Sequence, residues 1–554
     1  MIHLITIMFY KFSIKQIRAF FLFLAIFIGL IHTWLLRYFI ESDSIPFLDI
    51  GDAVFRGDFG ALVNGVWNPI YAIIQGFFLF LLKPGLYSEI IVVHIVNFFT
   101  YAFALFCFEF FFRRFIEDKQ EEEVWMWMCL GYSLFIWSST NLITISGVTP
   151  DMLLSGFVYL ASGLLLKIKV GLKNWVNFVL LGLVLGLGYL TKEAMFPIAF
   201  VFIILSFFAV PDKKYKFLKS VVALACFLLI AGPFVFSLSK SRGYFTYGET
   251  GKLNYHWYAD RNVCECFENG FPGCSNLTHP LRVLFNDPTV FEYSTPFNVT
   301  YPLVYDTSYW CQGSKPYFDL IGQIKAILIN LREYFYLFFL MQIVLLTSYL
   351  ALLVLSGRKL KVIKDLLENW VMLTVPIFVM LMYSLVHVEF RYLGAYVVIF
   401  LLGLFSALKL PLVEEVQSVK KSLVLVSMFS MVLGGILSKD LLENRPLAQE
   451  LKVNLRVAKG LQKAGIKEGE KVGVIGIYDD YYWARLAKLH IIAEIPSDED
   501  ISNFWIADNT LKTSVLNVFK NAGAKILIAG RAPGYSSRFG WKHIEDTPYF
   551  FYKL

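Results

Sequence analysis

At Ile40 the sequence passes from the apolar run FFLFLAIFIGLIHTWLLRYFI (Phe20–Ile40) directly into ESDSIPFLDIGD (Glu41–Asp52). The run is long enough to cross a bilayer as a helix. It follows basic residues and lacks a small-residue cleavage site, which predicts a retained signal-anchor helix. The segment behind it is acidic, with the carboxylates Glu41, Asp43, Asp49 and Asp52. Charge at a membrane boundary is costly and usually functional, so the side of the membrane that this segment faces bears on the function.

The composition is that of a polytopic membrane protein. Of the 554 residues, 57% are hydrophobic and only 17% are charged. Several runs exceed the roughly 18 to 20 apolar residues that cross a bilayer. We expect about 11 membrane-spanning helices, which start near Phe20, Ile90, Val124, Met152, Trp175, Met195, Val221, Ile324, Trp370, Tyr392 and Ser422. The net charge of +7 comes from short basic loops between these runs and indicates no nucleic-acid partner.

The loops between the expected spans alternate in charge. The short basic ones are Arg113–Lys119, Lys167–Lys173, Lys213–Lys216, Arg358–Lys364 and Lys409–Lys421. The positive-inside rule assigns these loops and the N-terminus to the cytoplasm. The outer loops are then residues 41–89, 143–151, 192–194, 237–323 and 387–391, together with the tail from 438. The apolar run Pro69–Leu82 is short for a span, and if it crossed, every later basic loop would move outside. We therefore expect a helix that lies in the outer interface.

Two domains are predicted. Residues 1–437 form the transmembrane domain, with the outer loop 41–89 and the large outer loop 237–323. Residues 438–554 form a small extracytoplasmic α/β domain, because strand and helix patterns alternate there. The expected strands are 471–477, 490–494, 525–529 and 549–553, and the expected helices are 447–464, 482–489 and 511–522.

The large outer loop contains four of the seven cysteines: Cys264, Cys266, Cys274 and Cys311. Two disulfides with three possible pairings are the favoured interpretation in an exported loop, and free thiols or a metal site are the alternatives. The loop also has the sequons Asn276–Thr278 and Asn298–Thr300, which matter only in a cell with the matching machinery.

Further charged residues are predicted on the same outer side: Asp151, Lys192, Glu193, Glu389 and Arg391. Cations there suit a phosphate or diphosphate lipid headgroup. One carboxylate can act as general base on an acceptor, and a second can orient the acceptor or hold a divalent metal. Because no nucleotide-sugar pool exists outside the cell, an activated sugar must arrive there on a lipid.

The chain resembles the GT-C glycosyltransferases, the polytopic type that includes the protein O-mannosyltransferases and the lipid A aminoarabinose transferase. The acidic motif of that family's first outer loop matches Asp43–Ile50, and Asn64–Tyr71 resembles the loop before the family's interfacial helix. The resemblance covers roughly residues 15–410. It implies that Asp43 is the catalytic base, that Asp151 is the second acidic residue and that Lys192 contacts the carrier phosphate. Ser44 stands where many relatives have a second acid, so a metal, held by Asp43 and Asp151 if present, is an open question.

We therefore predict an inverting glycosyltransferase of the cell membrane that takes its sugar from a polyprenyl phosphate. Asp43 and Asp151 are the catalytic candidates, Lys192 and Arg391 the phosphate-binding ones, and the supporting residues are Glu41, Asp49, Asp52, Glu193 and Glu389. The acceptor is a glycan, a lipid or a protein. Plainer interpretations are a helix cap for Asp43, an interfacial side chain for Lys192 and a structural Glu389–Arg391 ion pair. The rival function is a transporter or flippase for a lipid-linked glycan, but the charges lie at the boundary rather than at mid-membrane.

Overall fold

The computed structural model describes residues 12–171, 175–211, 215–260, 282–293, 299–305, 316–357, 362–447, 451–476, 481–530, 532–533 and 539–554. The four loop cysteines and both asparagines of the sequons lie outside these residues, so the predicted disulfides stay predictions. The chain forms two compact units, and neither is continuous in sequence. Unit 1 comprises Met1–Leu36, Ile95–Tyr247 and Phe318–Asn444, and unit 2 comprises Arg37–His94, Gly248–Tyr317 and Arg445–Leu554.

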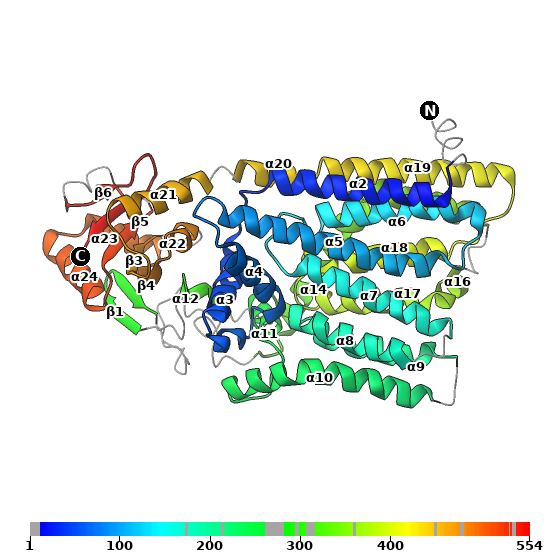
Figure 1. Ribbon diagram of the computed structural model, residues 1–554, viewed down its shortest axis with the longest axis horizontal. Coiled ribbons are helices and arrows are strands. Elements are labelled where there is room, and N and C mark those ends of the chain that lie inside the picture. Colours follow the sequence, from blue (N-terminus) through cyan, green and yellow to red (C-terminus); the bar gives the residue numbers. More distant parts are fainter. Residues whose placement is uncertain are drawn as a thin grey trace. The chain divides into compact units, whose positions relative to one another are not determined.

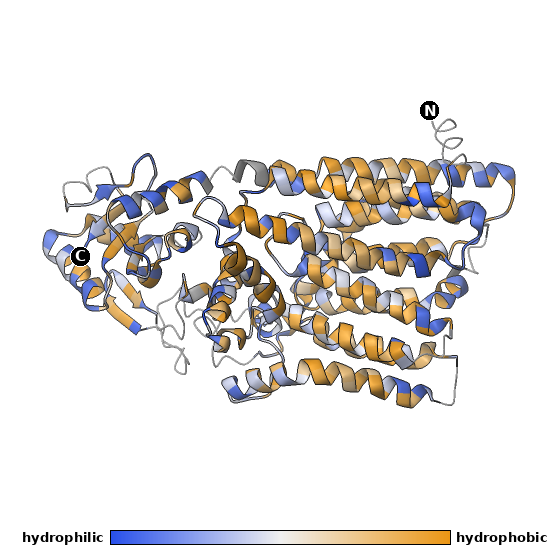
Figure 2. Ribbon diagram, viewed as in Figure 1, coloured by the Kyte–Doolittle hydropathy of each residue, from blue (hydrophilic) through white to orange (hydrophobic). Residues whose placement is uncertain are grey.

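Unit 1 is a bundle of apolar helices that run side by side, with hydrophilic residues gathered at the helix ends (Figures 1 and 2). Its helices are α2 (Ile14–Leu35), α5 (Glu89–Ile116, which begins in unit 2), α6 (Glu121–Asn141), α7 (Asp151–Lys169), α8 (Trp175–Thr191), α9 (Met195–Ala209), α10 (Lys216–Arg242), α14 (Leu320–Phe335), η4 (Tyr336–Leu340), α15 (Ile343–Leu355), α16 (Val362–Glu368), α17 (Trp370–Ser384), α18 (Phe390–Ser406), α19 (Glu414–Ile436) and α20 (Lys439–Leu447, which ends in unit 2).

Each predicted span falls on one of these helices. Within the described residues, five helices are long and apolar enough to cross a membrane, or six if a bent pair counts as one span. The protein is therefore a multi-pass membrane protein, and the predicted number of spans stays a prediction. The span expected from Ile324 is the bent pair: Leu320–Leu340 and Ile343–Leu355 meet at 75°. The π-helix η4 lies directly before this bend, and such a widened turn is a common cause of a sharp bend.

Small residues allow the helices of unit 1 to pack closely. A Cβ on Gly182 of α8 would lie 2.2 Å from the carbonyl oxygen of Ala223 on α10, and one on Gly186 would lie 2.6 Å from Ile230. In lipid, helix association depends on such close packing because apolar burial alone gives little gain. The spacing of the two glycines therefore fixes α8 against α10.

Unit 2 contains the first predicted outer loop as helices. These are η1 (Ser42–Ser44), α3 (Ile45–Phe55), η2 (Phe59–Leu62) and α4 (Pro69–Leu82). The helix α4 has the bounds predicted for the interfacial helix and is too short to be counted as a span. It crosses α3 closely, because a Cβ on Gly76 would lie 2.5 Å from the Cα of Gly51.

The rest of unit 2 is built on a seven-stranded sheet. Its order is β1 (Arg282–Asn286), β2 (Thr289–Glu292), β4 (His490–Ile495), β3 (Lys471–Ile475), β5 (Ile526–Ala529), β7 (Phe550–Lys553) and β6 (Lys542–His543). The helices of the unit are α11 (Thr250–Tyr255), η3 (His256–Asp260), α12 (Pro302–Tyr305), α21 (Leu451–Lys463), α22 (Tyr482–Leu486), α23 (Asp498–Ile506) and α24 (Asn509–Asn521). The core contains Phe504, Trp505, Phe519 and Trp541.

The sheet joins segments that the sequence assigned to two domains. The strands β3, β4 and β5 are parallel and come from the C-terminal tail, as expected. The antiparallel hairpin β1–β2 comes from the large loop and adds to β4. A domain confined to 438–554 therefore describes only part of this sheet, and the boundary at residue 438 stays a prediction.

Glu494 of β4 is a buried carboxyl that accepts a hydrogen bond of 2.5 Å from the Tyr301 hydroxyl. Burial raises the pKa of Glu494 from 4.5 to about 7. Below pH 4.5 the group is protonated in the folded and the unfolded chain alike. Between pH 4.5 and about 7 the folded chain keeps a proton that the unfolded chain has lost. The stabilisation of the folded chain that depends on this proton therefore declines as the pH rises and is gone above about pH 7.

We expect Glu494→Gln to remove this pH dependence. At pH 8 the variant should be more stable than the wild type by roughly 3 kcal/mol, since one pKa unit is worth about 1.4 kcal/mol. At pH 4.5 the two should be alike. Thermal unfolding of the full chain in detergent at both pH values measures this difference, with Glu468→Gln as the exposed control. A constant difference between wild type and Glu494→Gln at both pH values would contradict the assignment.

Candidate functional site

Asp43 lies in unit 2, in the short helix η1 directly before α3, and its side chain is exposed. The cap position of α3 is Ser44 rather than Asp43, and no side-chain hydrogen bond caps that helix. Ser44 is fully buried, so an acid at this position would have to be accommodated in the interior. The structure therefore gives Asp43 no capping role. Glu41, at the cap position of η1, is half-buried and makes no side-chain cap either.

Asp49 and Asp52 lie one turn apart on α3 and share one cation. The guanidinium of Arg485, on α22, is 2.8 Å from Asp49 Oδ1 and 3.0 Å from Asp52 Oδ2. The third carboxylate on this guanidinium is Glu89, at the first residue of α5, with its Oε1 2.9 Å from Arg485 Nε. Arg485 is only 5% exposed, so these charges are largely withdrawn from water and depend on one another.

The segment around Thr300 completes the surroundings of Asp49. The backbone N–H and the hydroxyl of Thr300 donate to the two carboxylate oxygens, at 2.8 and 2.9 Å. Thr300 is in turn bound to the sheet, because its carbonyl accepts a hydrogen bond of 3.0 Å from the N–H of Ile491. Asp49 is therefore engaged in holding α3 in place, and its predicted supporting role in sugar transfer stays a prediction.

A second group of charges lies in unit 1, where three helix ends meet. Asp151 is the first residue of α7, Lys192 directly follows α8, and Arg391 lies in the first turn of α18. The Lys192 ammonium is bound to Asp151 Oδ1, and Arg391 Nε lies 3.9 Å from Asp151 Oδ2. Asp151 is 2% exposed. The structure thus brings together one catalytic candidate and both phosphate-binding candidates.

Other side chains shape this group. The Lys192 ammonium lies 3.5 Å from the centre of the Tyr392 ring, and the Arg391 guanidinium lies 5.4 Å from it, within the range of cation–π attraction. Glu389 Oε1 is 3.2 Å from His387 Nε2, and this hydrogen bond holds the pKa of Glu389 below its ordinary value. Glu193 is buried beside Lys192 in the chain. Two cations therefore face the buried Asp151 carboxylate, and both lie near the Tyr392 ring.

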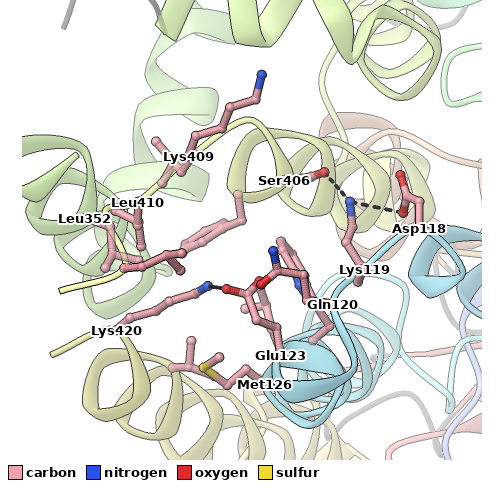
Figure 3. Close-up of a pocket in the computed structure, with 16 residues that line it drawn as sticks. Asp118, Lys119, Gln120, Glu123, Met126, Leu352, Ser406, Lys409, Leu410 and Lys420 are labelled. Carbon is pink, nitrogen blue, oxygen red and sulfur yellow. Dashed lines mark hydrogen bonds and ion pairs between the residues drawn. The ribbon is translucent and has the colours of Figure 1, made fainter. Parts of the chain in front are cut away.

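The opposite ends of the bundle carry the predicted cytoplasmic loops. A cavity of about 380 Å³ lies there between the loop after α5 and the connection from α18 to α19 (Figure 3). Lys119 Nζ donates to Ser406 Oγ at 2.8 Å, and Lys420 Nζ lies 2.5 Å from Glu123 Oε1. These contacts bring two basic loops to one end of the bundle, as the charge pattern requires.

The two residues predicted to hold a metal if one is present, Asp43 and Asp151, belong to different units of the chain, so the metal stays a prediction. Among the described residues, no group of three His, Cys, Asp or Glu side chains could hold a metal ion. Asp151 is already bound by the cations Lys192 and Arg391. A carboxylate neutralised in this way is a poor metal ligand, so no step below uses a metal.

Sequence reasoning missed Arg485, Glu89, Thr300 and Tyr392. Tyr392 follows Arg391 in the chain, so a cation–aromatic pair was a local signal that could have found it. Arg485 lies in a predicted helix of the tail, and nothing in its neighbourhood indicates partners more than 390 residues earlier in the chain. Only the fold brings Arg485 and its carboxylates together.

Comparison with solved structures defines the fold. It is shared with ArnT, and the resemblance predicted from the sequence is confirmed at the level of the fold. The chain is similar to ArnT from Cupriavidus metallidurans bound to undecaprenyl phosphate, with a TM-score of 0.56 and 10% identity over 97% of this chain and 98% of that one. The same ArnT in the apo state matches with a TM-score of 0.42 and 12% identity over 95% of this chain and 96% of that one. The Archaeoglobus fulgidus oligosaccharyltransferase in complex with Zn and sulfate matches with a TM-score of 0.46 and 12% identity over 93% of this chain and 68% of that one. No protein-family model and no curated protein matches the chain.

Proposed function

We propose that this protein is an inverting membrane glycosyltransferase that moves a sugar from a polyprenyl phosphate to an acceptor on the outer face of the cell membrane. The fold supports the class, because it is shared over nearly the whole of both chains with an ArnT that binds undecaprenyl phosphate. The N-terminus would be cytoplasmic, and residues 438–554 would lie outside with the loops 41–89 and 237–323.

The observation that carries the proposal is the meeting of Lys192 and Arg391 at Asp151. Both cations come from helix ends that the charge pattern assigns to the outer side, and each is next to the same buried carboxylate. An arginine and a lysine that lie side by side suit a phosphate, which offers several acceptor oxygens. Asp151 keeps the two cations together in the absence of the donor, so the site is arranged before the phosphate arrives.

The proposed reaction is a single displacement at the anomeric carbon of the sugar. The acceptor oxygen or nitrogen forms a bond to this carbon while the bond from the carbon to the phosphate oxygen breaks. Asp43 takes the proton of the acceptor. The electron pair leaves with the phosphate, whose new charge is stabilised by Lys192 and Arg391. One displacement on the face opposite the leaving group inverts the configuration.

Sugar transfer by the purified full chain tests this proposal. The protein would be placed in lipid nanodiscs with polyprenyl phosphates that carry different sugars, and mass spectrometry would follow the release of free polyprenyl phosphate. We expect that polyprenyl phosphate is released only when an acceptor is present, and that the rate depends on which sugar the lipid carries. In proteoliposomes, movement of the intact lipid-linked sugar between leaflets without its cleavage would instead establish the rival transporter function.

A further inference from the structure

The C-terminal tail holds the acidic loop at two points. One is the Tyr481 hydroxyl, which donates a hydrogen bond of 2.8 Å to the carbonyl oxygen of Ser42, the residue before Asp43. The other is Arg485, which contacts Asp49 and Asp52 on the helix that follows Asp43. Asp43 therefore lies between two anchored positions of one short segment, Ser42–Asp52.

Both anchors come from one rigid part of the tail. Tyr481 directly precedes α22 and Arg485 lies within it. Between them, Trp483 is fully buried, and its backbone N–H donates to Asn454 Oδ1 of α21 at 2.8 Å. A five-residue helix has little stability of its own, so this buried indole and the Asn454 bond keep Tyr481 and Arg485 at fixed positions.

Arg485 contacts three carboxylates, whereas a simple ion pair needs only one. A buried guanidinium with three carboxylates fixes the direction of each one, because its donors form a planar fork. Two of these carboxylates lie on one face of α3, so the fork sets the rotation of that helix about its axis. Rotation of α3 would move Asp43, which lies two residues before its start.

We infer that Arg485, with Tyr481, is a positioning residue of the C-terminal tail that sets the orientation of the Asp43 segment for sugar transfer. This inference rests on the proposed function, since it assumes that Asp43 acts on the acceptor. The tail thereby contributes to the site without touching substrate. A small misplacement of a catalytic group costs on the order of 100-fold in rate, so the effect is measurable.

The test compares turnover and local exchange in full-length variants. Arg485→Ala should lower kcat about 100-fold and leave the KM for the lipid donor nearly unchanged, because the phosphate-binding candidates are elsewhere in the chain. Arg485→Lys should recover part of this loss, since an ammonium can still pair with one or two carboxylates. Tyr481→Phe removes one hydroxyl from an intact ring, so it keeps the variant series informative if Arg485→Ala does not fold. Arg456→Ala, an exposed arginine on α21, is the matched control.

Amide hydrogen exchange gives a readout that does not depend on activity. The amides of residues 42–55 should exchange at least about 10-fold faster in Arg485→Ala, and those of α24 at the wild-type rate. Unchanged kcat in Arg485→Ala or Tyr481→Phe would overturn the inference, as would equal losses in kcat and donor binding. If the wild type transfers no sugar from any donor, the proposed function fails alone, and the exchange of residues 42–55 still decides whether Arg485 orders them.

Discussion

Replacement of Asp43 by Asn is expected to lower kcat for sugar transfer about 1,000-fold, in the middle of the range that a general base contributes. An amide cannot take the proton of the acceptor, but it has nearly the same size and shape as the carboxylate. The side chain is exposed, so the substitution changes a charge at the surface and not in the interior. The KM for the lipid donor should change little, because phosphate binding is assigned to other residues. Steady-state release of polyprenyl phosphate by the purified variant measures both constants.

The matched control for this substitution is Asp58→Asn. Asp58 is also exposed, lies in the same loop region after α3 and makes no side-chain cap. It should therefore keep wild-type turnover and the same melting temperature as Asp43→Asn. Wild-type turnover in both variants would remove Asp43 from the mechanism. A shared loss in both would indicate an effect of net charge in the loop rather than a base at residue 43.

The apolar pattern predicted most of the fold because it is a local property. The helix α4 begins and ends at the predicted residues, Pro69 and Leu82, since proline starts a helix well and the apolar run ends there. The strand β3 follows from a run of buried aliphatic residues in the same way. The hairpin β1–β2 was not predicted, because its pairing with β4 joins residues about 200 positions apart and no local signal encodes that contact.

The charged residues also differ in whether a local pattern in the sequence could predict their contacts. Asp151, Lys192 and Arg391 could be predicted as a group because each lies at a helix end, and the charge pattern assigns those ends to one side. Arg485 could not, since its partners Asp49 and Glu89 precede it by hundreds of residues. Membrane topology therefore works as a long-range constraint on charges at helix ends, whereas contacts made by the tail need the folded chain.

Replacement of Lys192 by Met is expected to raise the KM for the lipid donor roughly 10- to 100-fold, since a hydrogen bond to a charged group is worth about 1.5 to 3 kcal/mol. Methionine keeps about the length of the aliphatic stem but has no charge. The turnover at saturating donor should fall less, because Arg391 still faces the leaving phosphate. Lys240→Met is the control, as an exposed lysine near the C-terminal end of α10.

The same substitution also removes a cation from the buried Asp151, which by itself destabilises the fold by about 2 to 5 kcal/mol. The double variant Asp151→Asn/Lys192→Met separates the two effects, because it removes both charges of the pair at once. Its melting temperature should return toward that of the wild type, while its donor KM stays as high as that of Lys192→Met. If the donor KM recovered together with the melting temperature, Lys192 would be a structural partner of Asp151, and the phosphate would have to be bound by other cations. A high donor KM in a stable protein would come from a changed phosphate site rather than from unfolding, so this pair of measurements decides whether the charges at the ends of α7 and α8 form a substrate site.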